Sequence, residues 1–159
     1  MSAAPLDALG VSQRLADYGA WLDAMDYEAW LGLFTADCDY QITTRENEQA
    51  GLPLALMWCD GQAMLADRLA SLQHVNEYNL HYPRHVMGMA RRLPDQAAAP
   101  HAFEAPYALY QTTLEGESRL FSVGRYAMQW RAVNGDWKLH TMRVIVDTAQ
   151  VPSLLACPI

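Results

Sequence analysis

The sequence predicts an α+β fold in which three helices from the first half of the chain pack on one face of a curved, mostly antiparallel sheet. Apolar residues recur at helical spacing over 11–31 and 60–72, and at strand spacing after Pro83. Helices followed by strands indicate this class. The pair Asn134-Gly135 marks a tight hairpin between two long strands. A length of 159 residues suits one domain, so we expect residues 1–159 to form a single domain.

The first helix is predicted from apolar residues at spacings of four and three positions. A repeat of 3.6 residues per turn places such residues on one face, which then packs on a core. Asp26 is a suitable N-cap for a second, short helix, and Asp60 for a third. The predicted inner-face residues are Val11, Leu15, Tyr18, Leu22 and Met25 in the first helix, Trp30, Leu31 and Phe34 in the second, and Met64, Leu65, Leu69 and Leu72 in the third.

Two short strands are predicted in the first half of the chain, and we expect them to pair. The polar segment between them, 45–51, is typical of a loop. Longer strands follow and form a meander up to the tail at 151–159. The predicted strands are 39–44, 54–58, 85–92, 103–114, 118–133 and 137–148.

Apolar residues occupy both faces of the last strand. Met142, Val144 and Val146 share one face, whereas Leu139 and Ile145 lie on the other. A sheet that is covered by helices on one side normally presents a polar face to water on the other. We therefore expect a partner to cover the second face.

The overall charge and the cysteine pattern exclude several classes of protein. The net charge of −7 is the opposite of the basic footprint of a nucleic-acid-binding protein. No apolar run approaches the ~18 residues of a membrane span, and residues 1–5 do not begin a signal peptide. Cys38, Cys59 and Cys157 are odd in number and far apart, as in proteins of a reducing cytosol. We expect a cytoplasmic protein that binds neither nucleic acid nor membranes.

The composition favours a protomer that is buried among partners. Charged residues make up only 18% of the chain, compared with ~25% in typical soluble proteins. Lys138 is the only lysine among eleven basic residues, whereas there are eight Tyr, five Trp and eight Met. Arg, Tyr, Trp and Met are enriched at buried interfaces, where Lys is depleted.

Acid–base chemistry in an apolar cavity is the enzymatic alternative. A carboxylate or histidine in such a cavity can titrate near neutral pH. His85, His140 and Asp39 are the candidates for a stand-alone dehydratase or isomerase, with Asp37 and Tyr18 approaching from the helical side. Ordinary hydrogen bonding remains the commoner role for each histidine, and a ligand-binding module is a further alternative.

Metal and nucleotide chemistry are poorly supported by the sequence. His81, His85 and Glu77 are the only local group that could form a two-histidine, one-carboxylate iron site, but Pro83 separates the histidines and rules out a helical pair. The cysteines lack metal-ligand spacing, and no glycine-rich phosphate loop or nucleophile elbow occurs.

An ordered set of segments resembles one known family. The set includes Asp17-Tyr18, Leu22-Asp23, Trp30-Leu31, Leu33–Tyr40, Asp60–Arg68, Asn76-x-Tyr78 and Arg84–Gly88. In this order, the segments resemble the small (beta) subunits of Rieske non-haem iron aromatic-ring-hydroxylating dioxygenases. The resemblance is greatest to the terephthalate dioxygenase, salicylate 5-hydroxylase and anthranilate dioxygenase types, and it covers nearly the whole chain.

The resemblance implies an NTF2-like (cystatin-like) cone and a non-catalytic structural subunit in aromatic compound catabolism. In such enzymes, the alpha subunit carries the Rieske [2Fe–2S] cluster and the mononuclear Fe(II), and a reductase or ferredoxin supplies electrons from NAD(P)H. The beta subunits support the alpha subunits and typically form a trimer within an α3β3 assembly. No catalytic, cofactor or metal residue is therefore expected here. Arg68, Tyr82, Arg84 and His85 are expected to make structural or subunit contacts.

Overall fold

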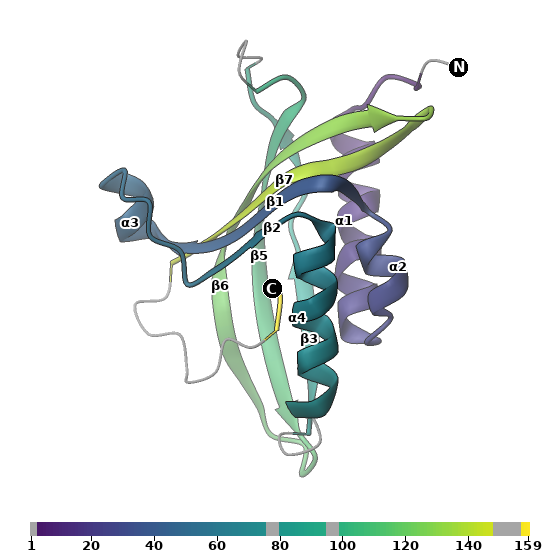
Figure 1. Ribbon diagram of the computed structural model, residues 1–159. Coiled ribbons are helices and arrows are strands. Elements are labelled where there is room, and N and C mark those ends of the chain that lie inside the picture. Colours follow the sequence, from purple (N-terminus) through teal and green to yellow (C-terminus); the bar gives the residue numbers. More distant parts are fainter. Residues whose placement is uncertain (1–2, 76–79, 95–98, 148–156) are drawn as a thin grey trace.

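The computed structural model describes residues 3–75, 80–94, 99–147 and 157–159, and it confirms the α+β class (Figure 1). Glu77, Thr148 and most of the tail therefore lie outside the described residues. The elements in chain order are α1 (Ala8–Asp23), α2 (Tyr27–Leu31), β1 (Phe34–Thr44), α3 (Arg45–Gln49), β2 (Met57–Asp60), α4 (Gln62–Val75), β3 (His81–Met87), β4 (Arg91–Arg92), β5 (Ala102–Thr113), β6 (Ser118–Val133) and β7 (Asp136–Val146).

The strands form one curved sheet in the order β2-β1-β7-β6-β5-β3, with β4 paired to β5. All the described pairings are antiparallel except the parallel pair of β1 and β7. The predicted early pair is confirmed as β1 and β2, and the hairpin at Asn134-Gly135 is confirmed by positive φ angles at both residues. Figure 1 shows α1, α2 and α4 gathered on one side of the sheet, while α3 projects at its far end.

The predicted helical stripe of α1 is confirmed over most of its length. Val11, Leu15, Tyr18 and Leu22 are buried. Met25 was wrongly assigned to this stripe: α1 ends at Asp23, and Met25 is exposed in the turn with a φ of 57°. The prediction for Met64 was also wrong, because this side chain faces away from the core on α4.

Of the two predicted N-cap residues, one is confirmed and the other is wrong. The Asp26 carboxylate accepts the Ala29 N–H at 3.2 Å and caps α2, as predicted. Asp60 is instead the last residue of β2, and the Gly61 carbonyl accepts the first helical hydrogen bond of α4 from Leu65.

Several predicted boundaries were wrong. Phe34 begins β1 rather than ending α2, and the predicted loop at 45–51 contains the short helix α3, which Thr44 caps by accepting the Asn47 N–H. The strand predicted at 54–58 begins only at Met57, and its apolar residues are largely exposed. The strand predicted from His85 begins at His81, because an edge strand tolerates Pro83.

A bulge in β7 changes which face His140 occupies. Trp130 pairs with Leu139 and Gln129 pairs with Thr141, so His140 is the extra residue between two pairs. Leu139 therefore enters the core together with Met142, Val144 and Val146. Strict alternation along the last strand predicts that His140 shares a face with Met142, Val144 and Val146, and the bulge makes this prediction wrong.

Candidate functional site

The interior of the cone is filled by its own side chains. Tyr18, Trp30, Tyr40 and Tyr126 are fully buried, and their rings and that of Phe34 meet at centroid distances of 4.7–6.4 Å. Such edge-to-face and tilted packing is favourable for aromatic rings. The predicted acid–base alternative requires an open polar cavity here, and these aromatic side chains occupy that space.

Ile159 completes this interior. Its carbonyl accepts hydrogen bonds from the Tyr18 hydroxyl at 2.7 Å and the Tyr40 hydroxyl at 3.1 Å, and its N–H donates to the Tyr40 hydroxyl at 3.0 Å. Burial raises the pKa of both phenols well above the ordinary value of 10. The two hydroxyls therefore remain protonated and act as structural donors.

His85 forms a buried pair with Asp23 at the base of α1. His85 Nδ1 lies 2.6 Å from the Asp23 carboxylate, which also accepts the His85 backbone N–H at 3.1 Å. The side chains are only 2% and 8% exposed. Arg84, which is 72% exposed, lies 3.6 Å from the same carboxylate. The Asp23 carboxylate thus links the C-terminal end of α1 to the edge strand β3.

His140 belongs to a separate polar cluster at the bulge. Arg131 Nη2 lies 2.8 Å from His140 Nε2, and His140 Nδ1 lies 3.2 Å from the Thr35 hydroxyl. Arg131 also pairs with Asp37 at 2.8 Å, and its guanidinium holds the pKa of that carboxyl down to about 2. The charged and ring-nitrogen groups of Arg131, Asp37 and His140 therefore all have partners within the cluster.

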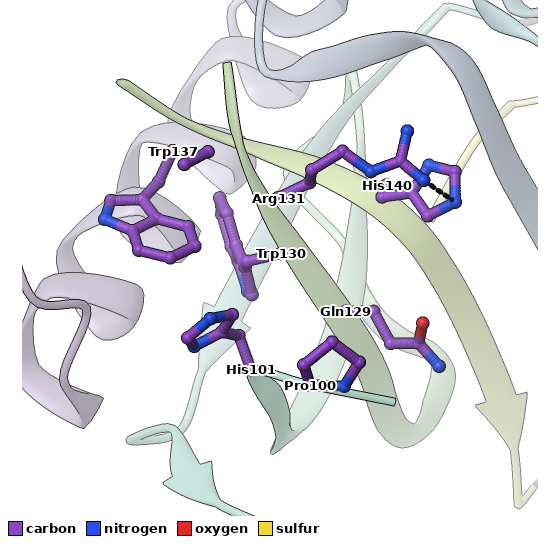
Figure 2. Close-up of a pocket in the computed structure, with 8 residues that line it drawn as sticks. Pro100, His101, Gln129, Trp130, Arg131, Trp137 and His140 are labelled. Carbon is purple, nitrogen blue, oxygen red and sulfur yellow. Dashed lines mark hydrogen bonds between the residues drawn. The ribbon is translucent and has the colours of Figure 1, made fainter. Parts of the chain in front are cut away.

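An open pocket of about 350 Å³ adjoins this cluster (Figure 2). No pattern in the sequence predicts this pocket, because it forms where β5 begins beside the β6–β7 hairpin. Since Arg131 is bound to Asp37 and His140, the pocket offers a ligand mainly aromatic surface. Its lining residues are Pro100, His101, Gln129, Trp130, Arg131, Ala132, Trp137 and His140.

His85 and His140, two candidates for the enzymatic alternative, do not lie together. His85 lies on β3 and packs toward α1, whereas His140 lies on β7 with its ring among outer-face residues. Two strands separate β7 from β3 in the sheet, so the residues are at least about 14 Å apart at ~4.8 Å per strand, and the register offsets them further along the strands. The structure therefore does not bring these two residues together for acid–base catalysis.

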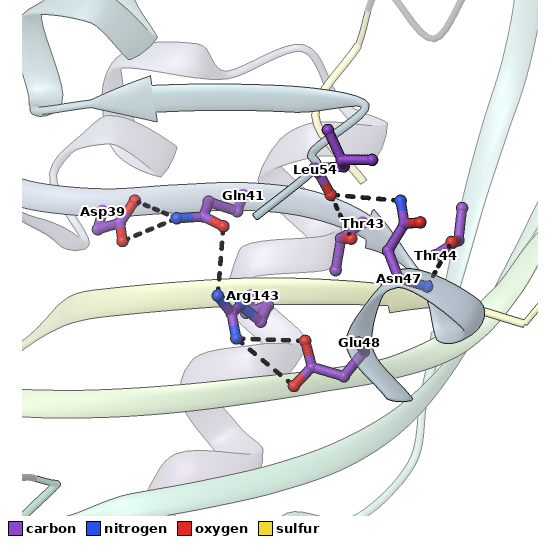
Figure 3. Close-up of polar contacts among 8 residues, drawn as sticks. All are labelled: Asp39, Gln41, Thr43, Thr44, Asn47, Glu48, Leu54 and Arg143. Carbon is purple, nitrogen blue, oxygen red and sulfur yellow. Dashed lines mark hydrogen bonds and ion pairs between the residues drawn. The ribbon is translucent and has the colours of Figure 1, made fainter. Parts of the chain in front are cut away.

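Asp39, the third residue of the enzymatic alternative, lies in a polar network on the outer face (Figure 3). It accepts hydrogen bonds from the Gln41 amide at 3.0 Å and the Trp58 indole at 2.8 Å. Gln41 accepts from Arg143, which pairs with Glu48 on α3 at 3.2 Å. This network fixes the projecting α3 segment to the sheet.

The segment that follows α3 exposes apolar side chains although it is firmly held. The Leu54 carbonyl accepts the Thr43 hydroxyl at 2.8 Å, and the Leu56 N–H donates to the Ile42 carbonyl at 2.7 Å. Yet Leu54, Leu56 and Trp58 are 58%, 47% and 56% exposed. We define the β2-edge patch as Leu54, Leu56 and Trp58 together with the neighbouring carboxylates Asp39 and Asp60.

A second exposed apolar surface lies at the opposite edge of the sheet. Arg84 on β3 pairs directly with Tyr110 on β5, which pairs with Leu120 on β6, so these side chains share the outer face. Tyr82 and Val86 flank Arg84 on the same face. We define the β3-edge patch as Tyr82, Arg84, Val86, Tyr110 and Leu120, all of which are exposed.

The four residues predicted to make subunit or structural contacts lie in three different places in the structure. Tyr82 and Arg84 lie in the β3-edge patch, and His85 points inward to Asp23. Arg68 is exposed on α4, where its charge and hydrogen bond lower the pKa of Cys59 against the larger raising effect of burial. The β2-edge patch was missed because an apolar run has the same sequence pattern whether it is buried or exposed.

Two further features concern metals and membranes. Within the described ranges, no group of three or more His, Cys, Asp or Glu side chains could hold a metal ion. No helix among the described residues is long and apolar enough to cross a membrane.

The chain matches one known protein family over most of its length. Residues 19–153 match the family model of the ring hydroxylating beta subunit, and the chain belongs to this family. The resemblance predicted from the sequence is thus confirmed.

Particular relatives agree with this assignment. The chain is 37% identical to the small subunit of anthranilate 1,2-dioxygenase from Burkholderia cepacia, over 89% of this chain and 88% of the relative. It is 29% identical to beta subunit 1 of the terminal oxygenase component of terephthalate 1,2-dioxygenase from Comamonas sp, over 91% and 93% of the two chains.

Solved structures confirm the predicted cone. The beta subunit of a candidate aromatic-ring-hydroxylating dioxygenase from Novosphingobium aromaticivorans is 36% identical and superposes with a TM-score of 0.83 over 96% of each chain. An NTF2-like protein with a cystatin-like fold from the same organism superposes with a TM-score of 0.63 over 94% of this chain and 87% of its own, at 14% identity. The second likeness concerns the fold alone.

Proposed function

We propose that residues 1–159 form a single domain that acts as the non-catalytic small subunit of an aromatic-ring-hydroxylating oxygenase. Its task is to hold the catalytic large subunits in position for aromatic compound catabolism. The observation that carries this proposal is the β2-edge patch. Its large apolar side chains are exposed to solvent, although hydrogen bonds fix the segment that carries them to the sheet. Exposed apolar surface of this kind marks interaction sites.

The closed interior supports an assembly role over a stand-alone activity. The residues proposed for a dehydratase or isomerase are dispersed, with His85 bound to Asp23, His140 bound to Arg131 and Asp39 bound to Trp58. A general base must reach its substrate within hydrogen-bond distance. None of the three faces an open cavity in the interior of the described structure.

The large subunit supplies the chemistry in this proposal. It carries the Rieske [2Fe–2S] cluster and the mononuclear Fe(II), receives electrons from a reductase or ferredoxin, and assembles with a trimer of this chain in the cytoplasm. Anthranilate and terephthalate, named for the two relatives, are both aromatic carboxylates. We infer that the oxygenase containing this chain hydroxylates an aromatic carboxylate.

Co-expression tests the proposal directly. The chain is produced alone and together with a Rieske-type large subunit of an aromatic-ring-hydroxylating oxygenase, and each preparation is assayed for hydroxylation of anthranilate and terephthalate. The expected result is co-purification with the large subunit, hydroxylation of an aromatic carboxylate by the complex, and none by the chain alone. Hydroxylation by the isolated chain, or failure to co-purify with a Rieske protein, would contradict the proposal.

A further inference from the structure

The pocket where β5 begins beside the β6–β7 hairpin has the size of a small-molecule site (Figure 2). Its volume of about 350 Å³ lies in the range of ~300–1,000 Å³ that is typical of ligand pockets. Its lining residues are all distinct from the residues of the β2-edge and β3-edge patches. The assembly role proposed for the exposed sheet edge therefore leaves this pocket unexplained.

One wall of the pocket is aromatic. The rings of His101 and Trp137 meet edge to face with their centroids 4.7 Å apart, and Trp130 lies beside them (Figure 2). Pro100 adds a further apolar surface. The Trp137 indole N–H donates to the Ala4 carbonyl at 2.7 Å, which holds this ring in place. Such a wall is suited to a flat ring, because offset and edge-to-face contacts between aromatic groups are favourable.

The other side of the pocket carries hydrogen-bond donors. Gln129 and Arg131 flank Trp130 on β6, so their side chains leave the strand on its other face (Figure 2). The Arg131 guanidinium is held by two contacts with Asp37 and one with His140, and its side chain is 47% exposed. A guanidinium has five N–H groups, so N–H groups of Arg131 remain for a ligand. Its planar shape is suited to a carboxylate, which it can bind through two parallel hydrogen bonds.

Two features indicate that the aromatic wall is not optimised for stability alone. Among the buried polar atoms of the described residues, Trp130 Nε1 and His101 Nδ1 have no hydrogen-bond partner. Buried groups without a partner are rare and cost free energy. His101 also has a φ of 58°, in the left-handed region that residues other than glycine seldom adopt. Strained residues of this kind occur most often at functional sites.

We propose that this pocket binds an aromatic carboxylate, with the ring of the ligand against Trp137 and His101 and its carboxylate on Arg131. The aromatic wall selects a flat ring, and the cation beside it selects an anionic group. This is the class of molecule that we infer for the substrate of the oxygenase. The inference nevertheless goes beyond the proposed function, because it gives the small subunit a ligand of its own.

Titration of the full chain with benzoate tests the proposal. Nuclear magnetic resonance of the isotope-labelled chain resolves the indole N–H groups, and Trp137→Leu and Trp58→Leu identify two of the signals. Benzoate should shift the Trp137 signal saturably and leave that of Trp58, on β2, unchanged. Cyclohexanecarboxylate lacks the flat ring and benzyl alcohol lacks the carboxylate, so each should bind at least about 10-fold more weakly. No saturable shift at Trp137, or equal binding of the three compounds, would overturn the proposal.

Matched arginine variants locate the carboxylate. Arg131→Gln should weaken benzoate binding by about 10-fold, whereas Arg143→Gln should leave it unchanged. Arg143 is the control because it also pairs with a carboxylate, that of Glu48 at 3.2 Å, but does not line the pocket. Equal losses with the two variants would contradict a carboxylate at Arg131.

A conservative variant keeps this test informative if Arg131→Gln does not fold. Arg131→Lys retains the charge but not the planar fork, so its affinity for benzoate should be lower than that of the wild type by a few fold, and circular dichroism verifies its fold. A folded Arg131→Lys chain with the benzoate affinity of the wild type would contradict the two parallel hydrogen bonds.

The outcomes separate this inference from the proposed function. Saturable binding of benzoate at Trp137, in a chain that does not co-purify with any Rieske protein, would support the ligand site and overturn the assembly function. Co-purification without benzoate binding at Trp137 would overturn the ligand site and leave the assembly function in place.

Discussion

Aromatic residues have different roles in the interior of the cone and at the outer edges of its sheet. Tyr18, Trp30 and Tyr40 are fully buried, and the hydroxyls of Tyr18 and Tyr40 both donate to the Ile159 carbonyl. Trp58 and Tyr82 are more than half exposed at the sheet edges, close to the charged residues Asp39 and Arg84. The excess of aromatic residues therefore divides into one set that stabilises the fold and another that is available for assembly.

The largest expected effect is on the interior. Trp30→Ala removes a fully buried ring that contacts Tyr18, Phe34 and Tyr40, and should lower the free energy of unfolding by about 3–5 kcal/mol. Urea denaturation followed by circular dichroism measures this change. Leu9→Ala, at an exposed position of α1, should change stability by less than about 0.5 kcal/mol. Equal effects of the two substitutions would contradict the division between interior and surface.

The next effect concerns the buried link between α1 and β3. Asp23→Ala leaves the His85 ring and backbone N–H groups without their acceptor. Hydrogen bonds to a charged group are worth ~1.5–3 kcal/mol, so we expect a loss of about 3 kcal/mol in the same urea assay. Asp17→Ala, exposed on the same helix, is the control. A loss below 1 kcal/mol would show that the pair is not a structural element.

The edge aromatics should show the reverse pattern. Trp58→Ser and Tyr82→Ser remove exposed side chains, so each should change the free energy of unfolding by only about 0.5 kcal/mol. Both should nevertheless weaken assembly, measured as the mass of the complex by sedimentation. Variants that destabilise the isolated chain but assemble normally would remove the distinction between the two aromatic sets.

The smallest effect is a pH dependence at the outer cluster. Asp37 has a pKa of about 2 in the folded chain because Arg131 donates to it, compared with ~3.9 in an unfolded chain. Its contribution is therefore present above pH ~4 and is lost as the pH falls toward 2. The urea midpoints of the wild type and Asp37→Asn should differ at pH 5 and converge near pH 2. A difference that does not vary with pH would contradict this assignment.

Local patterns in the sequence were sufficient to predict the elements that depend on near neighbours. The stripe from Val11 to Leu22 and the Asn134-Gly135 turn are examples, because helix periodicity and turn chemistry act over a few residues. The family resemblance added the cone. These features together account for the confirmed fold class.

The errors arose where distant segments decide the outcome. The face of His140 depends on a bulge set by pairing with β6, and the parallel pairing of β1 with β7 joins segments about a hundred residues apart. The run from Leu54 to Trp58 was predicted to be buried because hydrophobicity alone does not say which molecule covers a strand. The proposed interface lies where this prediction failed.

The central claim is that assembly covers the edges of the sheet while the interior is already closed. Hydroxyl-radical footprinting of the dilute chain and of its complex with the large subunit tests this claim at single aromatic residues. We predict that Trp58 and Tyr82 are oxidised in the dilute chain and protected in the complex, whereas Trp30 and Tyr40 are protected in both. Equal oxidation of Trp58 and Tyr82 in the two preparations would contradict it.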